Sequence, residues 1–325
     1  NYIGSEKEYP GENDGYVYQK YNAVVNALFF GCLKVMEKIA IDLDEVEDAL
    51  LFKKYYERVK VQYLKTFQDP SSGLINDGQD TNHKSQHANM FALTFGLIPE
   101  QNIDQVVKYI SSRGMSCSVY GSQILLEGLF ENGGSNHAIK LMAAKTERSW
   151  YNMIRYGSTI SMEAWDKRYK PNLDLNHAWG ASPANIIVRK MMGVEPLYPG
   201  AQSIKIHPKI GNLSFAKLKT SLISGEVIVS CQQKQNEFTL EVEIPGQITF
   251  PINLQNCKAG LAVTDAEVCH AMKYLFNEFG VKAEPSGCVS LAAVLSGKIN
   301  IANKVVLITI SGGNVDDEAF QQYIT

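Results

Sequence analysis

The 325-residue sequence has few of the features that define several classes of protein. Its six cysteines include no C-x-x-C pair, which argues against a zinc site or a disulfide framework. No apolar run reaches the roughly 18 residues of a membrane-spanning helix, and no signal-peptide pattern opens the chain. The net charge is −3, so no positive field favours nucleic acid or an anionic membrane. We expect no metal, cofactor, nucleic-acid or membrane partner, and the compartment and oligomeric state stay open.

The first two hundred residues carry the periodicity of amphipathic helices. From Tyr21 to Ile39 the apolar residues recur every three or four positions, and a second such pattern runs from Phe52 to Phe67. Five further helices are expected at about 85–97, 103–111, 122–130, 135–144 and 182–192. Helices in pairs, joined by turns rich in Gly, Asn and Pro and without a tight sequence repeat, favour part of an α/α toroid over a solenoid.

The pattern changes twice after Gly193. About residues 200–255 alternate apolar and polar side chains, which predicts short antiparallel strands. The capping box Thr264-x-x-Glu267 then predicts a helix through Phe279, with another helix at about 286–295. The apolar run 305–310 predicts a buried strand that leads into a Gly-rich turn. We therefore expect a mainly α protein with a β domain: a partial toroid at 1–195, a small antiparallel β-sandwich at 196–256 and a short α/β tail at 257–325.

One segment, residues 147–180, concentrates the chemistry. It holds all three tryptophans and four polar residues of interest: Trp150, Trp165, Trp179, Glu163, Asp166, Asp174 and His177. Aromatic faces cover the apolar face of a sugar, carboxylates and imidazole bind its hydroxyl groups, and glycoside hydrolysis needs two carboxyl groups. Each residue also has an ordinary interpretation: a tryptophan in the core, a solvated glutamate, a structural histidine. The clustering favours a sugar site.

Residues 1–250 resemble the C-terminal part of bacterial α-L-rhamnosidases of glycoside hydrolase family 78. The matching motifs are Gly15-Tyr16-Val17, Gln86-His87-Ala88-Asn89-Met90-Phe91-Ala92-Leu93, Ser112-Arg113-Gly114-Met115, Ser118-Val119-Tyr120-Gly121, Ser149-Trp150-Tyr151-Asn152-Met153-Ile154, Met162-Glu163-Ala164-Trp165-Asp166, Leu175-Asn176-His177-Ala178-Trp179-Gly180 and Pro199-Gly200. The resemblance implies a six-hairpin (α/α)6 barrel followed by a β-sandwich. It also implies inverting hydrolysis of terminal α-L-rhamnosides, with a rhamnose-containing oligosaccharide or glycoside as the ligand.

The same resemblance implies roles for individual residues. Glu163 matches the general base that activates water, and His177 matches a histidine that binds the sugar. Trp150 and Trp165 match aromatic positions near the pocket, and Tyr120 is a weaker candidate for its wall. Asp166 is expected at most to orient the loop of the base.

The family's general acid lies in a C-P-x-R-x-E-type segment that starts the barrel. That segment and the first helices of the barrel are missing from this sequence, so Asn1 is expected to fall inside the barrel. The sequence around Glu12 and Asp14 does not support either residue as a substitute. The chain is therefore expected to hold the base and to lack the acid. A non-catalytic carbohydrate-binding or degenerate module is the alternative.

Residues 261–320 resemble a different family, the C-terminal part of threonine/serine dehydratases, which are pyridoxal-phosphate enzymes of fold type II. The matching motifs are Val263-Thr264-Asp265-Ala266-Glu267-Val268, Glu284-Pro285-Ser286-Gly287, Leu295-Ser296-Gly297-Lys298 and Ser311-Gly312-Gly313-Asn314-Val315-Asp316. By this resemblance Ser311 corresponds to the serine that binds the pyridine nitrogen of the cofactor. The Schiff-base lysine and the phosphate loop of that family are missing, so the tail is expected to be a remnant without cofactor.

Overall fold

The computed structural model describes residues 12–170, 172–201, 203–223, 225–234, 237–244, 261–313 and 315–325. The chain divides into two compact units, Asn1–Pro251 and Ile252–Thr325, which we describe separately. None of the described helices is long and apolar enough to cross a membrane. The predicted boundary near residue 256 lies outside the described residues, and the three-domain division with its bounds stays a prediction.

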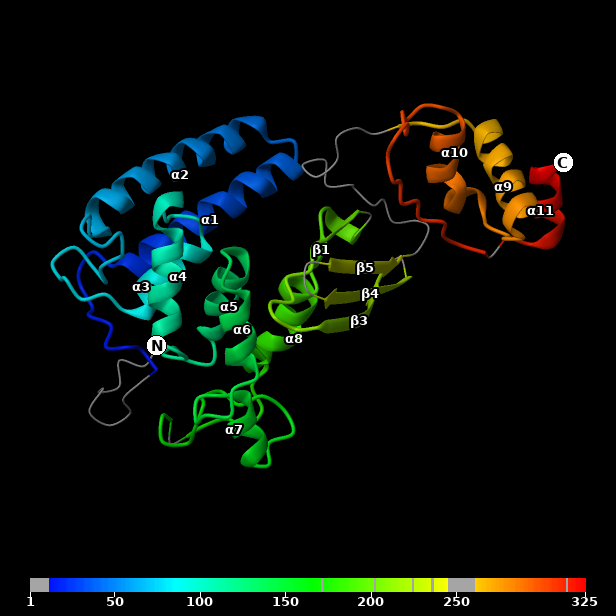
Figure 1. The fold of residues 1–325 in the computed structure, drawn as a ribbon. Helices are drawn as coiled ribbons and strands as arrows, with labels where there is room; N and C mark the ends of the chain where they lie inside the picture. Colours follow the sequence, from blue (N-terminus) through cyan, green and yellow to red (C-terminus); the bar gives the residue numbers. More distant parts are fainter. Residues whose placement is uncertain are drawn as a thin grey trace. The chain divides into compact units, whose positions relative to one another are not determined.

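Paired helices build most of the first unit, as the sequence predicts (Figure 1). The long hairpin consists of α1 (Ala23–Asp42), which Asn22 caps through a bond from the Val25 N–H, and α2 (Val46–Phe67). The helices that follow are α3 (Gln86–Thr94), α4 (Ile103–Ser112), α5 (Ser122–Glu131), α6 (Ser135–Met142), α7 (Trp150–Arg155) and α8 (Ser182–Ile186). The predicted helix at 182–192 is present, but its second half, Ile187–Met191, is a π-helix. The short helix α7 was not predicted.

Two polar side chains of α3 hold the neighbouring loops in place. The Asn89 amide bonds the backbone N–H and C=O of Ile75, at 2.9 and 3.0 Å, and both residues are fully buried. The Gln86 amide bonds the carbonyl oxygens of Ile110 and Gly114 and accepts from the Ser116 N–H. Since buried backbone groups need partners, these side chains fix the loops before α3 and after α4. The second of these loops leads into the candidate site.

Asp77 is a fully buried carboxylate that joins three segments of the unit. It accepts hydrogen bonds from the backbone N–H groups of Val17 at 2.9 Å and Ser85 at 2.8 Å, and it contacts His83 Nδ1 at 2.6 Å. Without it, two backbone donors would lose their acceptor in a place where water does not replace it.

We therefore expect Asp77→Ala to lower the free energy of unfolding by about 3 kcal/mol. Urea denaturation followed by circular dichroism measures this difference. Asp80→Ala is the matched control, since Asp80 is exposed and close in sequence, and it should change the stability by less than about 0.5 kcal/mol. Equal effects of the two substitutions would show that the Asp77 hydrogen bonds contribute little.

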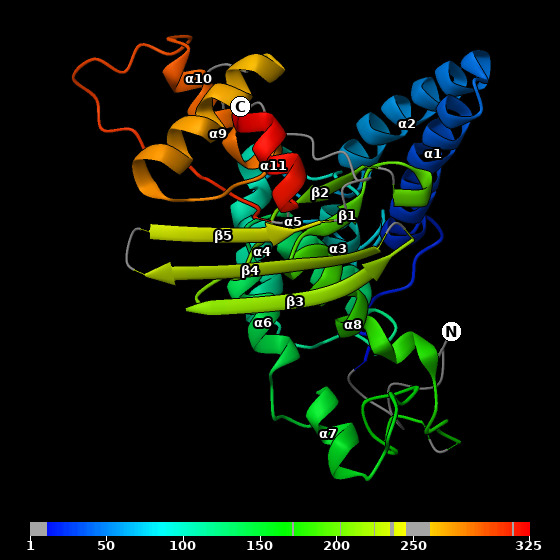
Figure 2. The same ribbon diagram turned by 90° about the vertical axis from the view of Figure 1, so that its right-hand side faces the viewer.

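Two antiparallel sheets follow the helices. β1 (Val194–Pro196) pairs with β2 (Ile204–Ile206), and β3 (Phe215–Leu222), β4 (Gly225–Lys234) and β5 (Glu237–Glu243) form a three-stranded sheet in that order (Figure 2). On β4 the buried side chains are Val227, Val229 and Cys231, which alternate with less buried ones. This is the period-two pattern of the sequence, because one face of the sheet packs on a core.

The second unit is helical in the part that the structure describes. α9 (Asp265–Phe279) has the predicted capping box of Thr264 and Glu267 and ends at Gly280 in the left-handed conformation, with φ of 66°. α10 (Val289–Leu295) and α11 (Asp317–Ile324) pack with it, and α11 was not predicted.

The strand expected at residues 305–310 is not formed, so that prediction is wrong. Val305 and Leu307 are fully exposed. A strand of this apolar type is stable only when neighbouring strands bond both of its edges, and the described residues of this unit supply none. Ser311 follows in the same irregular stretch and is exposed.

Candidate active site

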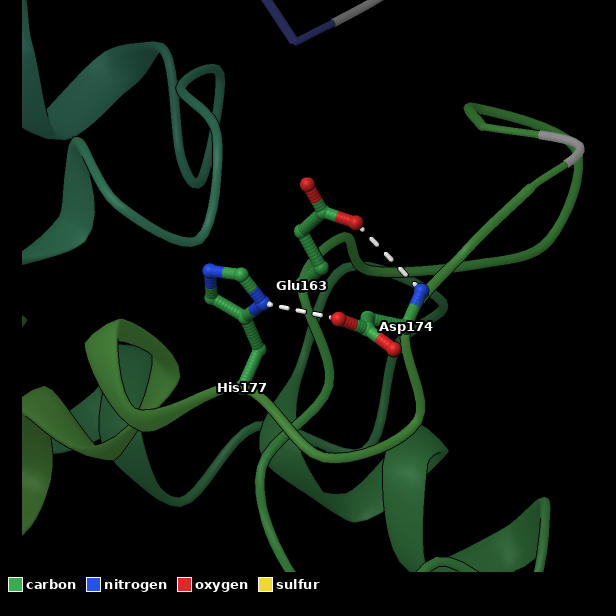
Figure 3. A group of neighbouring side chains, drawn as sticks. All are labelled: Glu163, Asp174 and His177. Carbon is green, nitrogen blue, oxygen red and sulfur yellow. Dashed lines mark hydrogen bonds and ion pairs between the residues drawn. The ribbon is translucent and has the colours of Figure 1, made fainter.

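The centre of the candidate site is a loop between α7 and α8 that brings two predicted site residues, Glu163 and His177, together with Asp174 (Figure 3). The Glu163 N–H donates to the Asp174 carbonyl at 3.0 Å, and the Asp174 N–H donates to Glu163 Oε2 at 3.3 Å. His177 Nδ1 lies 3.5 Å from Asp174 Oδ2. The His177 backbone is fixed by Ser161, whose carbonyl accepts from the His177 N–H at 2.8 Å. These hydrogen bonds and contacts thus hold Glu163, Asp174 and His177 close together, although Glu163 and His177 are 14 positions apart in the sequence.

Glu163 is held as a carboxylate. Its Oε1 bonds the Lys170 ammonium, and this contact is the main reason why the pKa of Glu163 lies below its usual value. The backbone bond from Asp174 lowers the pKa further, while partial burial works in the opposite direction. Glu163 is therefore ionised at neutral pH and can accept a proton.

Behind the loop stand two tryptophans in edge-to-face contact, with ring centroids 4.9 Å apart. Trp165 is fully buried, and its indole N–H donates to the Cys117 carbonyl at 2.7 Å. The indole N–H of Trp150 donates to the Gly180 carbonyl at 2.7 Å. A Cβ atom at Gly180 would come within 2.7 Å of the Met162 carbonyl oxygen. The backbone segments around Gly180 and Met162 therefore approach each other closely, which favours a glycine at this position.

The burial of Trp165 corrects one prediction. A ring with no exposed surface has no face for a sugar, so Trp165 shapes the loop of Glu163 instead of binding substrate. Trp150 is half-buried against it. Two exposed aromatic rings lie next to His177: the ring centroid of Trp179 is 4.3 Å from that of His177 and 5.1 Å from that of Tyr120. Trp179 belongs to the matching motif around His177, but no role was predicted for it from the sequence.

Glu12, which its sequence context did not support as a catalytic residue, lies next to this loop in the structure. It is half-buried, and its Oε1 accepts a hydrogen bond from the backbone N–H of Trp165 at 3.3 Å. Desolvation is the largest cause that raises the pKa of Glu12 to about 7, and the negative charge of Glu163 raises it further. The Trp165 bond and the charges of Arg148 and Lys170 act in the opposite direction. Glu12 is therefore mostly protonated below pH 7 and mostly ionised above it, and its charge interacts with that of Glu163.

The structure thus places the predicted residues in three positions. Glu163 and His177 meet in one loop, Tyr120 joins them through Trp179, and Trp150 and Trp165 support the loop from behind. Asp166 accepts a bond from the Asn152 amide at 3.3 Å, and Asp14 pairs with Arg113. Ser311 belongs to the other unit.

A metal ion could find ligands in the same loop. One oxygen or nitrogen atom from each of Glu163, Asp174 and His177 lies within 4.8 Å of the others. The Lys170 ammonium, however, already supplies the positive charge at Glu163. The cluster by itself does not indicate a metal centre.

The helical hairpins of the first unit are those of a six-hairpin glycosidase domain. The bacterial alpha-L-rhamnosidase 6 hairpin glycosidase domain matches residues 6–191, and the bacterial alpha-L-rhamnosidase C-terminal domain matches residues 193–267. The first match covers more than half of the chain and includes Glu12. The chain belongs to the family of bacterial α-L-rhamnosidases.

Curated and solved relatives agree with this assignment. An alpha-L-rhamnosidase of an Alteromonas species is 24% identical over 258 residues, and one of Formosa agariphila is 26% identical over 261 residues. These matches cover 75% and 76% of this chain, but the chain spans only 27% of the length of either relative. The structure of an alpha-L-rhamnosidase from Dictyoglumus thermophilum has a TM-score of 0.62 at 23% identity, over 75% of this chain and 28% of that one. The Streptomyces avermitilis enzyme, solved with L-rhamnose, has a TM-score of 0.58 at 22% identity, over 70% of this chain and 23% of that one.

Relatives of a second kind match a smaller part of the chain. A serine racemase of Dictyostelium discoideum is 37% identical over 99 residues, which are 30% of this chain and 31% of the racemase. A catabolic L-threonine dehydratase of Staphylococcus aureus is 38% identical over 120 residues, which are 36% of this chain and 32% of the dehydratase. These matches support in part the resemblance of the tail to dehydratases.

Proposed function

We propose that Glu163 is the general base of an inverting α-L-rhamnosidase site in this chain, and that Glu12, which lies outside the C-P-x-R-x-E-type segment expected to supply the family's acid, serves here as the proton donor. The observation that supports this most strongly is the opposite tuning of the two carboxyl groups. Lys170 lowers the pKa of Glu163 and so keeps this carboxylate ionised. Desolvation raises the pKa of Glu12 to about 7, so Glu12 is mostly protonated at pH values below 7. Two carboxyl groups whose environments push their pKa values apart are suited to divided acid and base roles.

The mechanism follows from these protonation states. Glu163 would remove a proton from a water molecule as that water attacks the anomeric carbon of the rhamnoside. Glu12 would give its proton to the glycosidic oxygen as the bond to the leaving group breaks. His177 would bind hydroxyl groups of the sugar, and the rings of Trp179 and Tyr120, which contact His177 and each other, would cover its apolar face.

The proposed inverting mechanism predicts the anomer that forms first. Incubated with an aryl α-L-rhamnoside, the chain should release β-L-rhamnose, which proton NMR distinguishes from the α-anomer before mutarotation. In inverting sites the carboxyl groups stand roughly 6.5–9.5 Å apart so that water fits between base and sugar. Initial release of the α-anomer would contradict the roles of both carboxyl groups. Binding of rhamnose without release of any sugar would favour the non-catalytic carbohydrate-binding alternative.

For the tail we propose descent from a dehydratase without retention of its cofactor chemistry. The residues present do not fit pyridoxal phosphate: Ser311 is exposed, and the ammonium groups of Lys282 and Lys298 are paired with Asp317 and Glu267. Asn314, the last residue of the S-G-G-N motif, lies outside the described residues.

A further inference from the structure

The segment that joins α10 to α11 presents an apolar surface in the second unit (Figure 1). From Val305 to Ile310 the sequence reads V-V-L-I-T-I, and no charged side chain lies within this run. Val305 and Leu307 are fully exposed. Side chains branched at Cβ dominate the run and favour the strand conformation. Consecutive exposed apolar residues of this kind mark a surface that binds another protein segment.

Burial along the run follows the period-two pattern of a strand. Val305 and Leu307 are fully exposed, whereas Val306 between them is 41% exposed. Ile308 and Ile310 are half-buried, and Ile310 packs against the core around α9. One face of the run therefore lies on the unit and the other faces solvent. No backbone–backbone hydrogen bond joins residues 305–310 to another described residue, so the N–H and C=O groups of its edges are open to a partner strand.

The two ends of the run are attached to the rest of the unit. After the run, the Gly312 carbonyl accepts a hydrogen bond from the Glu284 N–H at 3.0 Å. Before the run, the Lys304 N–H donates to the Ile301 carbonyl at 3.0 Å and closes a turn. Because both ends are already held, a partner strand that binds the run has less conformational entropy to remove.

The charges that flank the run have opposite signs at its two ends. Lys304 precedes the run, and its ammonium contacts the Asn300 carbonyl at 3.0 Å. Asp316 and Glu318 follow the run and are exposed. An antiparallel pair of two copies places each Lys304 toward the acidic end of the other copy, whereas a parallel pair places like charges side by side. The run is thus complementary in charge to its own reversed copy.

We propose that residues 305–310 pair as antiparallel strands with the same residues of a second copy of this chain. With all six residues paired, the two-fold axis passes between Leu307 and Ile308. Each exposed Leu307 then lies opposite the partner's Ile308, and each exposed Val305 lies opposite the partner's Ile310. The exposed side chains of one copy thus adjoin the face that lies on the unit of the other copy.

This arrangement forms a closed dimer, because both copies use the same edge of the run. The outer edges meet water, as the edges of an antiparallel sheet can. An isolated two-stranded ribbon is only marginally stable in water, but each strand here already has one face on a core. The dimer does not depend on Glu163 or on any turnover, so the proposed function and this inference are tested separately.

Analytical ultracentrifugation of the full chain over a wide range of concentration is the first test. We expect a monomer–dimer equilibrium whose Kd rises at least tenfold in Leu307→Lys, because the ammonium would lie beside the apolar Ile308 of the partner. Leu307 is fully exposed in the single copy, so circular dichroism should show an unchanged fold. Leu50→Lys is the matched control on α2, where Leu50 is 63% exposed, and it should leave the Kd unchanged.

Two results of this experiment would overturn the proposal. One is a chain that stays monomeric at every concentration. The other is a dimer that Leu50→Lys weakens and Leu307→Lys does not, which would assign the interface to the α1–α2 hairpin.

Amide hydrogen exchange is the second test and detects the strand pair itself. The amides of residues 305–310 should be protected at concentrations where the dimer forms and should exchange rapidly in the monomer and in Leu307→Lys. A dimer without protection of these amides would show that the copies meet elsewhere. Growth into open-ended assemblies in place of a dimer would contradict the antiparallel two-fold pair.

Discussion

Glu12→Gln should lower kcat by about 10²- to 10⁴-fold on rhamnosides whose leaving group is an alkoxide, the usual worth of a general acid. Glutamine keeps the oxygen that accepts the Trp165 N–H at 3.3 Å, so the loop around Trp165 should stay in place. What it removes is the proton for the glycosidic oxygen. The loss should be much smaller for a 2,4-dinitrophenyl rhamnoside, because that leaving group departs without protonation.

The pH profile gives the same prediction an independent readout. Glu12 must be protonated to act as an acid, so kcat/KM of the unmodified chain should fall as the pH rises through about 7. In Glu12→Gln this descending limb should disappear. Glu57→Gln makes the same chemical change at an exposed position of α2 and should leave rate and profile unaltered. A loss of equal size for both leaving groups would show that Glu12 supports the structure and does not donate a proton.

The helices were the most predictable part of the fold because their signals are local. The capping box of Thr264 and Glu267 and the stop at Gly280 define α9 within a few residues, and the structure agrees at both ends. The spacing of apolar residues predicted α1 and α2 in the same way, since a helix completes its backbone bonds within itself. The strand at 305–310 failed for the opposite reason: its bonds depend on neighbouring strands, which its own residues do not specify.

In the candidate site, too, some features could be predicted from the sequence and others only from the folded structure. Glu163 and His177 are 14 residues apart, and the motifs around them singled out both residues, which the structure brings together in one loop. Trp165 belongs to the same motif, yet only its packing against Trp150 and its bond to Cys117 show that it is buried. Motif membership therefore predicted which residues gather at the site, but it did not predict which of them face outward.

Glu12 shows the largest gap between sequence and structure. It is 153 residues away from Trp165, which binds it, and its surroundings in the sequence carry no sign of catalytic use. Its raised pKa comes from desolvation and from the charge of Glu163, and both exist only once the chain is folded. The motif Gly15-Tyr16-Val17 just after it was the available hint that this stretch belongs to the barrel.

Glu163→Gln should remove the general base and lower kcat by about 10²- to 10⁴-fold, whatever the leaving group, because activation of water is required for every rhamnoside. This separates it from Glu12→Gln, whose effect depends on the leaving group. Azide adds a sharper readout in Glu163→Ala: a small anion that needs no deprotonation should restore cleavage of the dinitrophenyl substrate and yield β-L-rhamnosyl azide.

The acidic limb of the pH profile of kcat/KM tests whether Lys170 lowers the pKa of Glu163. Lys170 lowers the pKa of Glu163, so the carboxylate stays ionised, and the base stays active, well into the acidic range. Lys170→Met removes that ammonium, and the ascending limb of kcat/KM should shift to higher pH while the descending limb near 7 shifts much less. If azide fails to rescue Glu163→Ala and the ascending limb does not move in Lys170→Met, then Glu163 is not the base. The ion pair with Lys170 would in that case serve only to fold the loop.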